Sequence, residues 1–241
     1  MTLAVASVLF VATVVRSTFG FGEALIAVPL LALAIPVKTA APVAALVSIT
    51  VAAAVVARDW RHVHFGSAAR LIVSTLFGIP LGLLLLTRVA EPIVKSALAV
   101  IIIAFSLYAI RAHGWRLTSD RLAWLFGLLA GVLGGAYGMN GPPLAIYGSL
   151  RGWSPREFRA TLQGYFLPGS AVVMFGYWST GLWTPAVTHF YVTSLPGVIV
   201  AVGVGHILNR RISPRRFVIA VYIGLIAVGS VLLVQAARFA R

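Results

Sequence analysis

Two clusters of glycine, proline and polar residues interrupt long apolar runs in this sequence. The first, FGFGEALIAVP, covers residues 19–29, and the second, YGMNGPPLAIY, covers residues 137–147, about 118 positions later. Arg16 and Glu23 place a positive and a negative charge at the first cluster. Ionisable residues inside an apolar segment are costly and usually mark a site of function. The two clusters therefore predict a site that binds a charged solute.

The chemistry of broken helices favours an anion as that solute. A helix that begins inside a cluster points unpaired backbone N–H groups and a partial positive charge at its neighbourhood. Helix limbs that begin near 22–24 and 141–142 would aim at the same place, and proline suits a first helical turn. Arg16 would attract the anion, and amide groups would donate hydrogen bonds. The predicted substrate-binding residues are Arg16, Thr18, Gly20, Gly22, Gly138, Asn140, Gly141 and Gln163.

Several of these residues also allow a structural interpretation. Arg16 and Glu23 are separated by two helical turns, so they could form an ion pair that closes the break. If they do not, a Glu23 that takes up a proton at membrane depth is a candidate for proton coupling. His189, in the seventh apolar run, is a second candidate, although a lone histidine often serves as a hydrogen-bonding partner. Thr18 could simply cap the break.

Composition identifies the setting as a lipid bilayer. The chain of 241 residues is 60% hydrophobic and 10% charged, with a mean hydropathy of +0.99. Soluble domains are about one quarter charged, so we expect a polytopic membrane protein. The net charge of +14 comes from Lys and Arg between apolar runs, which suits anionic headgroups rather than nucleic acid.

The sequence offers little for catalysis or metal binding. It contains no cysteine and no His-Glu-x-x-His pattern, and its two aspartates lie near segment ends. A nucleophile–base pair or a set of metal ligands at membrane depth is therefore not expected, and no cofactor motif is found. This weighs against an intramembrane enzyme.

The apolar segments form two sets of four. We predict a single transmembrane domain over 1–241, with one repeat at 1–110, a linker at 111–121 and a second repeat at 122–241. The clusters, which share their spacing, lie in the first segment of each set. The segments are 3–35, 39–57, 68–87, 93–110, 122–150, 160–178, 185–208 and 217–236.

The first segment of each set is too long for an ordinary span. A helix over 3–35 would measure about 50 Å against a hydrocarbon core of about 30 Å. The segment could be a tilted, broken helix or a hairpin that re-enters the membrane. Two hairpins would leave thirteen Lys and Arg residues on one side of the membrane and five on the other, whereas two crossings would divide them ten to eight. The positive-inside rule favours the hairpins, which make the two halves inverted repeats with both termini outside the cytoplasm.

These residues resemble a known family. The blocks 19–31 and 138–144 are similar to the first-repeat and second-repeat motifs of sulfite exporter TauE/SafE-like permeases, and 79–82 and 151–166 are similar to other parts of that family. The resemblance implies a bacterial cytoplasmic-membrane transporter of small anions such as sulfite and organosulfonates. It covers essentially the whole chain.

The predicted function is secondary transport of a small anion held between the two clusters. A passive anion channel shares most of these features, and a membrane assembly protein is a further alternative. Paired interruptions in corresponding positions of two halves are typical of transporters, which favours the first interpretation.

Overall fold

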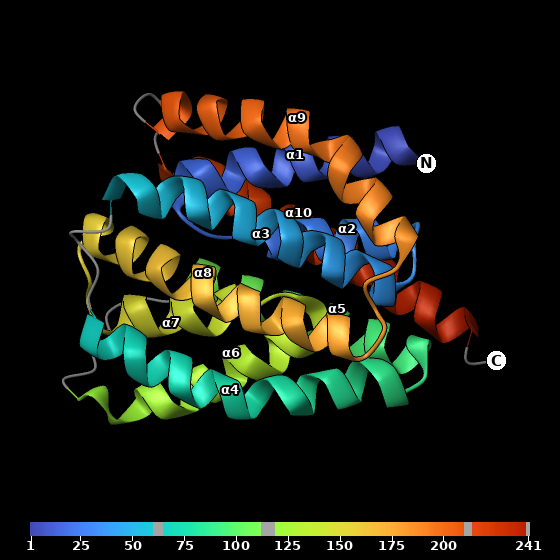
Figure 1. Ribbon diagram of the computed structural model, residues 1–241, viewed down its shortest axis with the longest axis horizontal. Helices are drawn as coiled ribbons and strands as arrows, with labels where there is room; N and C mark the ends of the chain where they lie inside the picture. Colours follow the sequence, from blue (N-terminus) through green and yellow to red (C-terminus); the bar gives the residue numbers. More distant parts are fainter. Residues whose placement is uncertain (60–64, 112–118, 210–213, 240–241) are drawn as a thin grey trace.

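The structure is a computed structural model that describes residues 1–59, 65–111, 119–209 and 214–239. Over these residues the chain is all-helical, with ten α-helices, one short 3-10 turn and no strand (Figure 1). This confirms the predicted helical class.

The chain order of the helices matches the eight apolar segments, with two segments divided. The N-terminal half (residues 1–110, the predicted first repeat) contains α1 (Thr2–Phe19), α2 (Glu23–Ala32), α3 (Val37–Asp59), α4 (Phe65–Arg88) and α5 (Glu91–Arg111), whose last residue reaches the linker. The 3-10 turn at Asp120–Leu122 leads into the C-terminal half (residues 122–241) with α6 (Ala123–Tyr137), α7 (Gly141–Leu150), α8 (Pro155–Ser179), α9 (Pro185–Asn209) and α10 (Pro214–Phe239).

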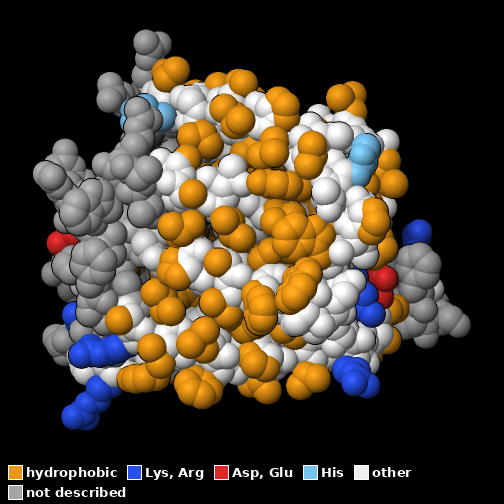
Figure 2. Space-filling view, in the orientation of Figure 1, with side chains coloured by type: hydrophobic (Ala, Val, Ile, Leu, Met, Phe, Trp, Pro, Cys, Tyr) orange, Lys and Arg blue, Asp and Glu red, His pale blue; other side chains and the backbone are white. Residues whose placement is uncertain are grey.

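Six helices of the described chain are long and apolar enough to cross a membrane: α1, α3, α4, α5, α9 and α10. Helix α8 has the length but is less apolar than these six helices. Hydrophobic side chains cover the middle of the face seen in Figure 2, while Lys and Arg gather toward its two ends. An apolar belt between two charged rims is the surface that a bilayer requires.

The chain turns back at both divided segments. Helix α2 returns toward the end of the bundle where α1 begins, and α7 returns toward the end where α6 begins (Figure 1). Because α1 and α2 fold against each other, Val15 and Ile26 line one small apolar pocket. Helix α10 ends at the same end of the bundle as the one where α1 begins (Figure 1).

Each divided segment packs its first helix against a helix of the other half. Helix α1 runs parallel to α9, as two contacts show. Near the starts of the helices Thr2 Oγ1 lies 3.4 Å from His189 Nε2, and near their ends Thr18 Oγ1 donates to the Gly205 carbonyl at 3.3 Å. Helix α6 lies against α4 along a seam of small residues, where a Cβ atom on any glycine would overlap the facing backbone. The seam consists of Gly78, Gly82, Gly127, Gly131 and Gly135. Such close contact is typical of membrane helices packed through glycine.

Two helices that cross the middle of the bundle complete the frame for the site. Helices α3 and α8 run in opposite directions (Figure 1). They meet near their midpoints, where Ser48 Oγ and Ser170 Oγ are 3.2 Å apart. The face of α8 that carries Gln163, Phe166 and Ser170, at helical spacing, points to α1 and α3.

Candidate functional site

Glycines in the left-handed conformation end the first helix of each half. Gly20 has φ 89° and its N–H bonds to the Arg16 carbonyl at 2.6 Å. Gly138 has φ 63° and its N–H bonds to the Gly134 carbonyl at 2.7 Å. Residues with a Cβ rarely adopt this conformation, which explains why glycine stands at both positions. Gly22 follows with φ 100° and redirects the chain into α2.

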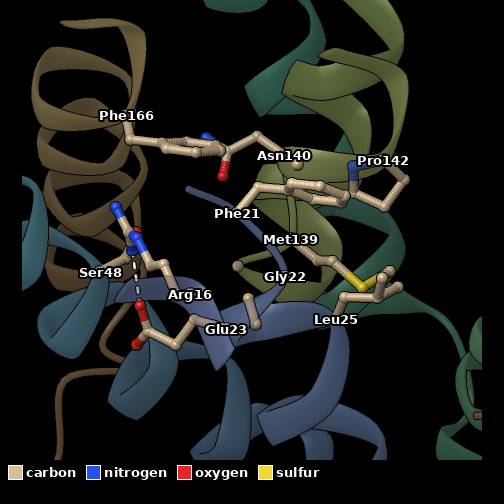
Figure 3. A pocket seen from close by; sticks show the side chains of 13 residues that line it. Arg16, Phe21, Gly22, Glu23, Leu25, Ser48, Met139, Asn140, Pro142 and Phe166 are labelled. Carbon is tan, nitrogen blue, oxygen red and sulfur yellow. Dashed lines mark hydrogen bonds and ion pairs between the residues drawn. The ribbon is translucent and has the colours of Figure 1, made fainter. Parts of the chain in front are cut away.

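The starts of α2 and α7 line one cavity (Figure 3). Neither helix has a side-chain cap at its first turn, and Pro142 and Pro143 occupy the start of α7. Asn140, which precedes α7, is 3% exposed. Its Nδ2 has no partner at hydrogen-bond distance within the described chain, although the side chain lies against the Tyr165 hydroxyl. Two uncapped helix starts and an unpaired amide donor make this cavity suitable for negative charge.

Arg16 supplies the positive charge of the cavity wall. Its Nη1 donates to Glu23 Oε2 at 2.5 Å and to Ser48 Oγ at 2.7 Å, and its Nη2 donates to Gln163 Oε1 at 2.9 Å. Arg16 and Glu23 are each 2% exposed. The predicted ion pair is therefore present, and it is embedded in a polar network that reaches three other helices.

Aromatic rings form another part of the cavity wall. The Arg16 guanidinium carbon lies 4.9 Å from the centre of the Phe166 ring, a distance at which a cation is attracted to the ring face. Phe21, Met139 and Leu25 add apolar surface (Figure 3). The free volume is about 20 Å³, which is room for one or two water molecules. An organic anion would fit only after the walls move apart.

The cavity lies about halfway along the bundle. Ser48 is the central residue of α3, which extends over Val37–Asp59, and Phe166 is one residue from the centre of α8. That position is typical of transporters that expose one site alternately to the two sides.

Comparison with known proteins now identifies the family. A family model described as "Sulfite exporter TauE/SafE" matches residues 5–232. The chain belongs to the TauE/SafE family. A relative from Cupriavidus necator, named "Probable sulfite/organosulfonate exporter TauE", is 27% identical over 199 residues, which cover 79% of this chain and 77% of that protein. No solved structure matches the chain.

Membership of the TauE/SafE family confirms the resemblance found in the sequence and has two consequences. The chain is a multi-pass membrane transporter that carries an anionic substrate, and it is not an enzyme. No group of three or more His, Asp or Glu side chains within the described residues could hold a metal ion.

The structure brings most of the predicted site residues of this TauE/SafE transporter together. Six of the eight predicted residues line the cavity or bond to a residue that does. Gln163 is the one of these six that does not line the cavity: its Oε1 accepts from Arg16, and its Nε2 donates to the Gly20 carbonyl at 2.7 Å. The other five of these six predicted residues line the cavity themselves: Arg16, Gly22, Gly138, Asn140 and Gly141. Gly20 is linked to the cavity through Gln163.

Two predicted residues are placed differently. Thr18 donates its hydroxyl to the carbonyls of Val14 and Gly205, so it holds α1 against α9 instead of lining the cavity. His189 is exposed near the beginning of α9, beside Thr2 at the N-terminal end of α1. The cavity lies much farther along α1, at Arg16, which separates His189 from the proposed substrate position.

Three residues of the site escaped the sequence analysis: Ser48, Phe166 and Ser170. Ser48 stands as a polar residue in the middle of an apolar run, which is a usable signal of an inward-facing position. Phe166 and Ser170 follow Gln163 by three and seven residues and therefore share its helix face. The sequence does not show that Gln163 points inward, so this shared face could not identify Phe166 and Ser170 as site residues.

Proposed function

We propose that this chain is a secondary transporter of small anions, with sulfite or organosulfonates as substrates. The substrate is held between the two helix breaks, where Arg16 and Asn140 and the starts of α2 and α7 meet at one cavity. That convergence is the observation that carries the proposal. The printed name of the Cupriavidus necator relative supports the choice of substrate class.

We further propose that the halves at 1–110 and 122–241 are inverted repeats in a bacterial cytoplasmic membrane. The opposed directions of α3 and α8 support this, as does the turning back of the chain at both breaks. With this topology the loops rich in Lys and Arg face the cytoplasm, and the two termini lie on the other side. The five Lys and Arg residues predicted on that other side are Lys38, Arg88, Lys95, Arg238 and Arg241, the last of which lies outside the described residues.

Proton coupling completes the proposal, and Glu23 is its best candidate. Glu23 lines the cavity and contacts Arg16, whereas His189 is exposed at the outer surface of the bundle. A proton-coupled transporter would accumulate the anion against its gradient when a pH gradient is imposed. A passive channel would only let the anion equilibrate.

The test uses the purified chain reconstituted in liposomes. Labelled sulfite and methanesulfonate are offered with and without a pH gradient, and accumulation above the external concentration is measured. We expect gradient-dependent accumulation that Arg16→Gln abolishes in protein that remains folded. Equilibration without accumulation would identify a channel, and absence of any anion flux would refute the proposal.

A further inference from the structure

The charge of Arg16 is already neutralised in this structure. The cavity wall contains one cation, Arg16, and one anion, Glu23, joined by a hydrogen bond of 2.5 Å. Both side chains are at most 3% exposed. A substrate anion that entered while this pair is intact would add an uncompensated negative charge in a poorly solvated place, which is strongly unfavourable. Something must therefore change at Glu23 before an anion can bind.

The second break shows that an ion pair is not needed to form such a turn. A shift of 118 residues aligns Gly20 with Gly138, and the same shift aligns Arg16 with Gly134 and Glu23 with Gly141. Gly138 ends its helix in the left-handed conformation just as Gly20 does, with two glycines where the first break has charges. The turn can therefore form without the Arg16–Glu23 ion pair, so the need to close the turn does not explain why the pair is present.

The ion pair leaves bonding capacity unused on both partners. Arg16 Nε and Glu23 Oε1 are buried and have no hydrogen-bond partner within the described chain. The guanidinium group could offer Nε to an incoming oxyanion in addition to the Nη1 atom that now holds Glu23. Buried polar atoms without partners are rare, and at a binding site they indicate a ligand that completes them.

We propose that Glu23 is a built-in counter-anion whose carboxylate occupies the place on Arg16 that a substrate oxyanion takes during transport. This rests on the proposed function, and it specifies how the same site is regulated. Solvent supplies one proton to a carboxylate oxygen of Glu23, the carboxyl group becomes neutral, and the Arg16 guanidinium donates its hydrogen bonds to the substrate instead. The charge of the site is the same before and after, so a monovalent anion binds together with one proton.

The surroundings of Glu23 leave Arg16 as the charged group that faces it. The helices packed against α2 are α1, α3, α5, α7 and α10. Tyr222 of α10 lines the apolar pocket behind Gly22, and Tyr147 of α7 packs against the rings of Phe126 and Trp153. The other described titratable side chains on these helices lie toward helix ends: Lys38, Glu91, Lys95, Tyr108, Arg111 and Arg238.

The experiment measures binding of methanesulfonate to the purified full chain in detergent by titration calorimetry. Titrations in buffers with different ionisation enthalpies give the number of protons taken up per anion. The test variant is Glu23→Gln, which keeps the shape of the side chain and removes its charge. The control is Glu91→Gln, because Glu91 pairs with Lys95 at 3.3 Å near the start of α5, away from the cavity.

For the unmodified chain we expect close to one proton per anion and an affinity that falls as the pH rises, by up to about tenfold per pH unit. Glu23→Gln should bind about tenfold or more tightly than the unmodified chain at pH 8, with little dependence on pH and no proton uptake. Glu91→Gln should behave as the unmodified chain does.

Proton uptake that persists in Glu23→Gln, or anion binding by the unmodified chain without proton uptake, would overturn this inference and the assignment of Glu23 as the coupling group, while leaving anion transport in place. Absence of binding of methanesulfonate, sulfite and sulfate by both folded proteins would refute the proposed function as well. If Glu23→Gln does not fold, the proton count of the unmodified chain alone decides the question.

Discussion

The side-chain amide of Gln163 is bonded to Gly20, the residue that ends α1, although the two lie 143 positions apart in the sequence. Its Nε2 donates to the Gly20 carbonyl at 2.7 Å, and its Oε1 accepts from Arg16 Nη2 at 2.9 Å. One residue of the C-terminal half thus fixes both the backbone of the first break and the direction of the guanidinium group. We infer that Gln163 is a positioning residue for Arg16.

Replacement of Gln163 by leucine tests this role. Leucine has a similar size but forms neither hydrogen bond, so Arg16 loses its orientation and anion uptake into liposomes should fall about tenfold or more. The control is Gln235→Leu in α10, the other glutamine of the chain. Equal uptake by the two variants would show that the amide does not position Arg16.

Removal of Arg16 alone should destabilise the fold, because Glu23 is left buried and unpaired. For Arg16→Gln we expect a loss of roughly 3–5 kcal/mol in the free energy of unfolding. The double variant Arg16→Gln, Glu23→Gln should regain most of that loss, since no buried charge remains. Denaturant-induced unfolding measures both effects. Neither variant should transport an anion, and restored transport in the double variant would contradict the assigned role of Arg16.

Gly138 should tolerate alanine poorly for two separate reasons. Its φ of 63° is unfavourable for any residue with a Cβ, and the added atom would lie 2.6 Å from the Ala41 carbonyl oxygen. Gly181 is a matched control with φ 72° and nothing within 4 Å of the added atom. Gly181→Ala should cost about 1–2 kcal/mol from conformation alone.

Gly138→Ala should lower the free energy of unfolding by clearly more than Gly181→Ala does, or prevent folding. The difference between the two variants reports the steric clash between the added Cβ and α3. Thermal unfolding of the purified proteins compares them. Similar unfolding temperatures would mean that α3 can move away from Gly138 without a penalty.

Asn140→Ala separates binding from stability. The Nδ2 donor of Asn140 has no partner among the described residues, so its loss should shift the unfolding temperature less than Arg16→Gln does. Anion uptake should nevertheless fall about tenfold, because the oxyanion loses one hydrogen bond from a group at its binding site. Thr13→Val is the control, since Thr13 Oγ1 is likewise buried and unpaired but does not line the cavity. An Asn140 variant with unaltered uptake would remove this residue from the site.

The helix breaks could be predicted because their cause is local. Gly20, Gly22 and Gly138 supply backbone conformations that other residues rarely adopt, and Pro142 suits a helix start, so the sequence carries the signal at the position itself. The start of α8 is also encoded locally: Ser154 and Glu157 form a capping box, which places the helix start at Pro155 rather than at residue 160, where the apolar run begins.

The inward faces of the helices could not be predicted in the same way. In a membrane bundle the lipid-facing side and the buried side of a helix are both apolar, so hydrophobic periodicity no longer distinguishes them. Ser48 and Ser170 meet across α3 and α8 only because those faces are turned together. The same limit explains Thr18, whose hydroxyl was expected at the substrate and is directed to Gly205 of α9 instead.

The exchange of partners between the halves decides where the bundle can open. Helix α1 is bonded to α9 through Thr18, and α4 packs against α6 with the two backbones in close contact at glycines. The first helix of each half, α1 or α6, therefore packs against a helix of the other half. We infer that a movement that widens the cavity parts the pair α1–α9 from the pair α4–α6, so the line of opening would cut across the two predicted repeats instead of following their boundary.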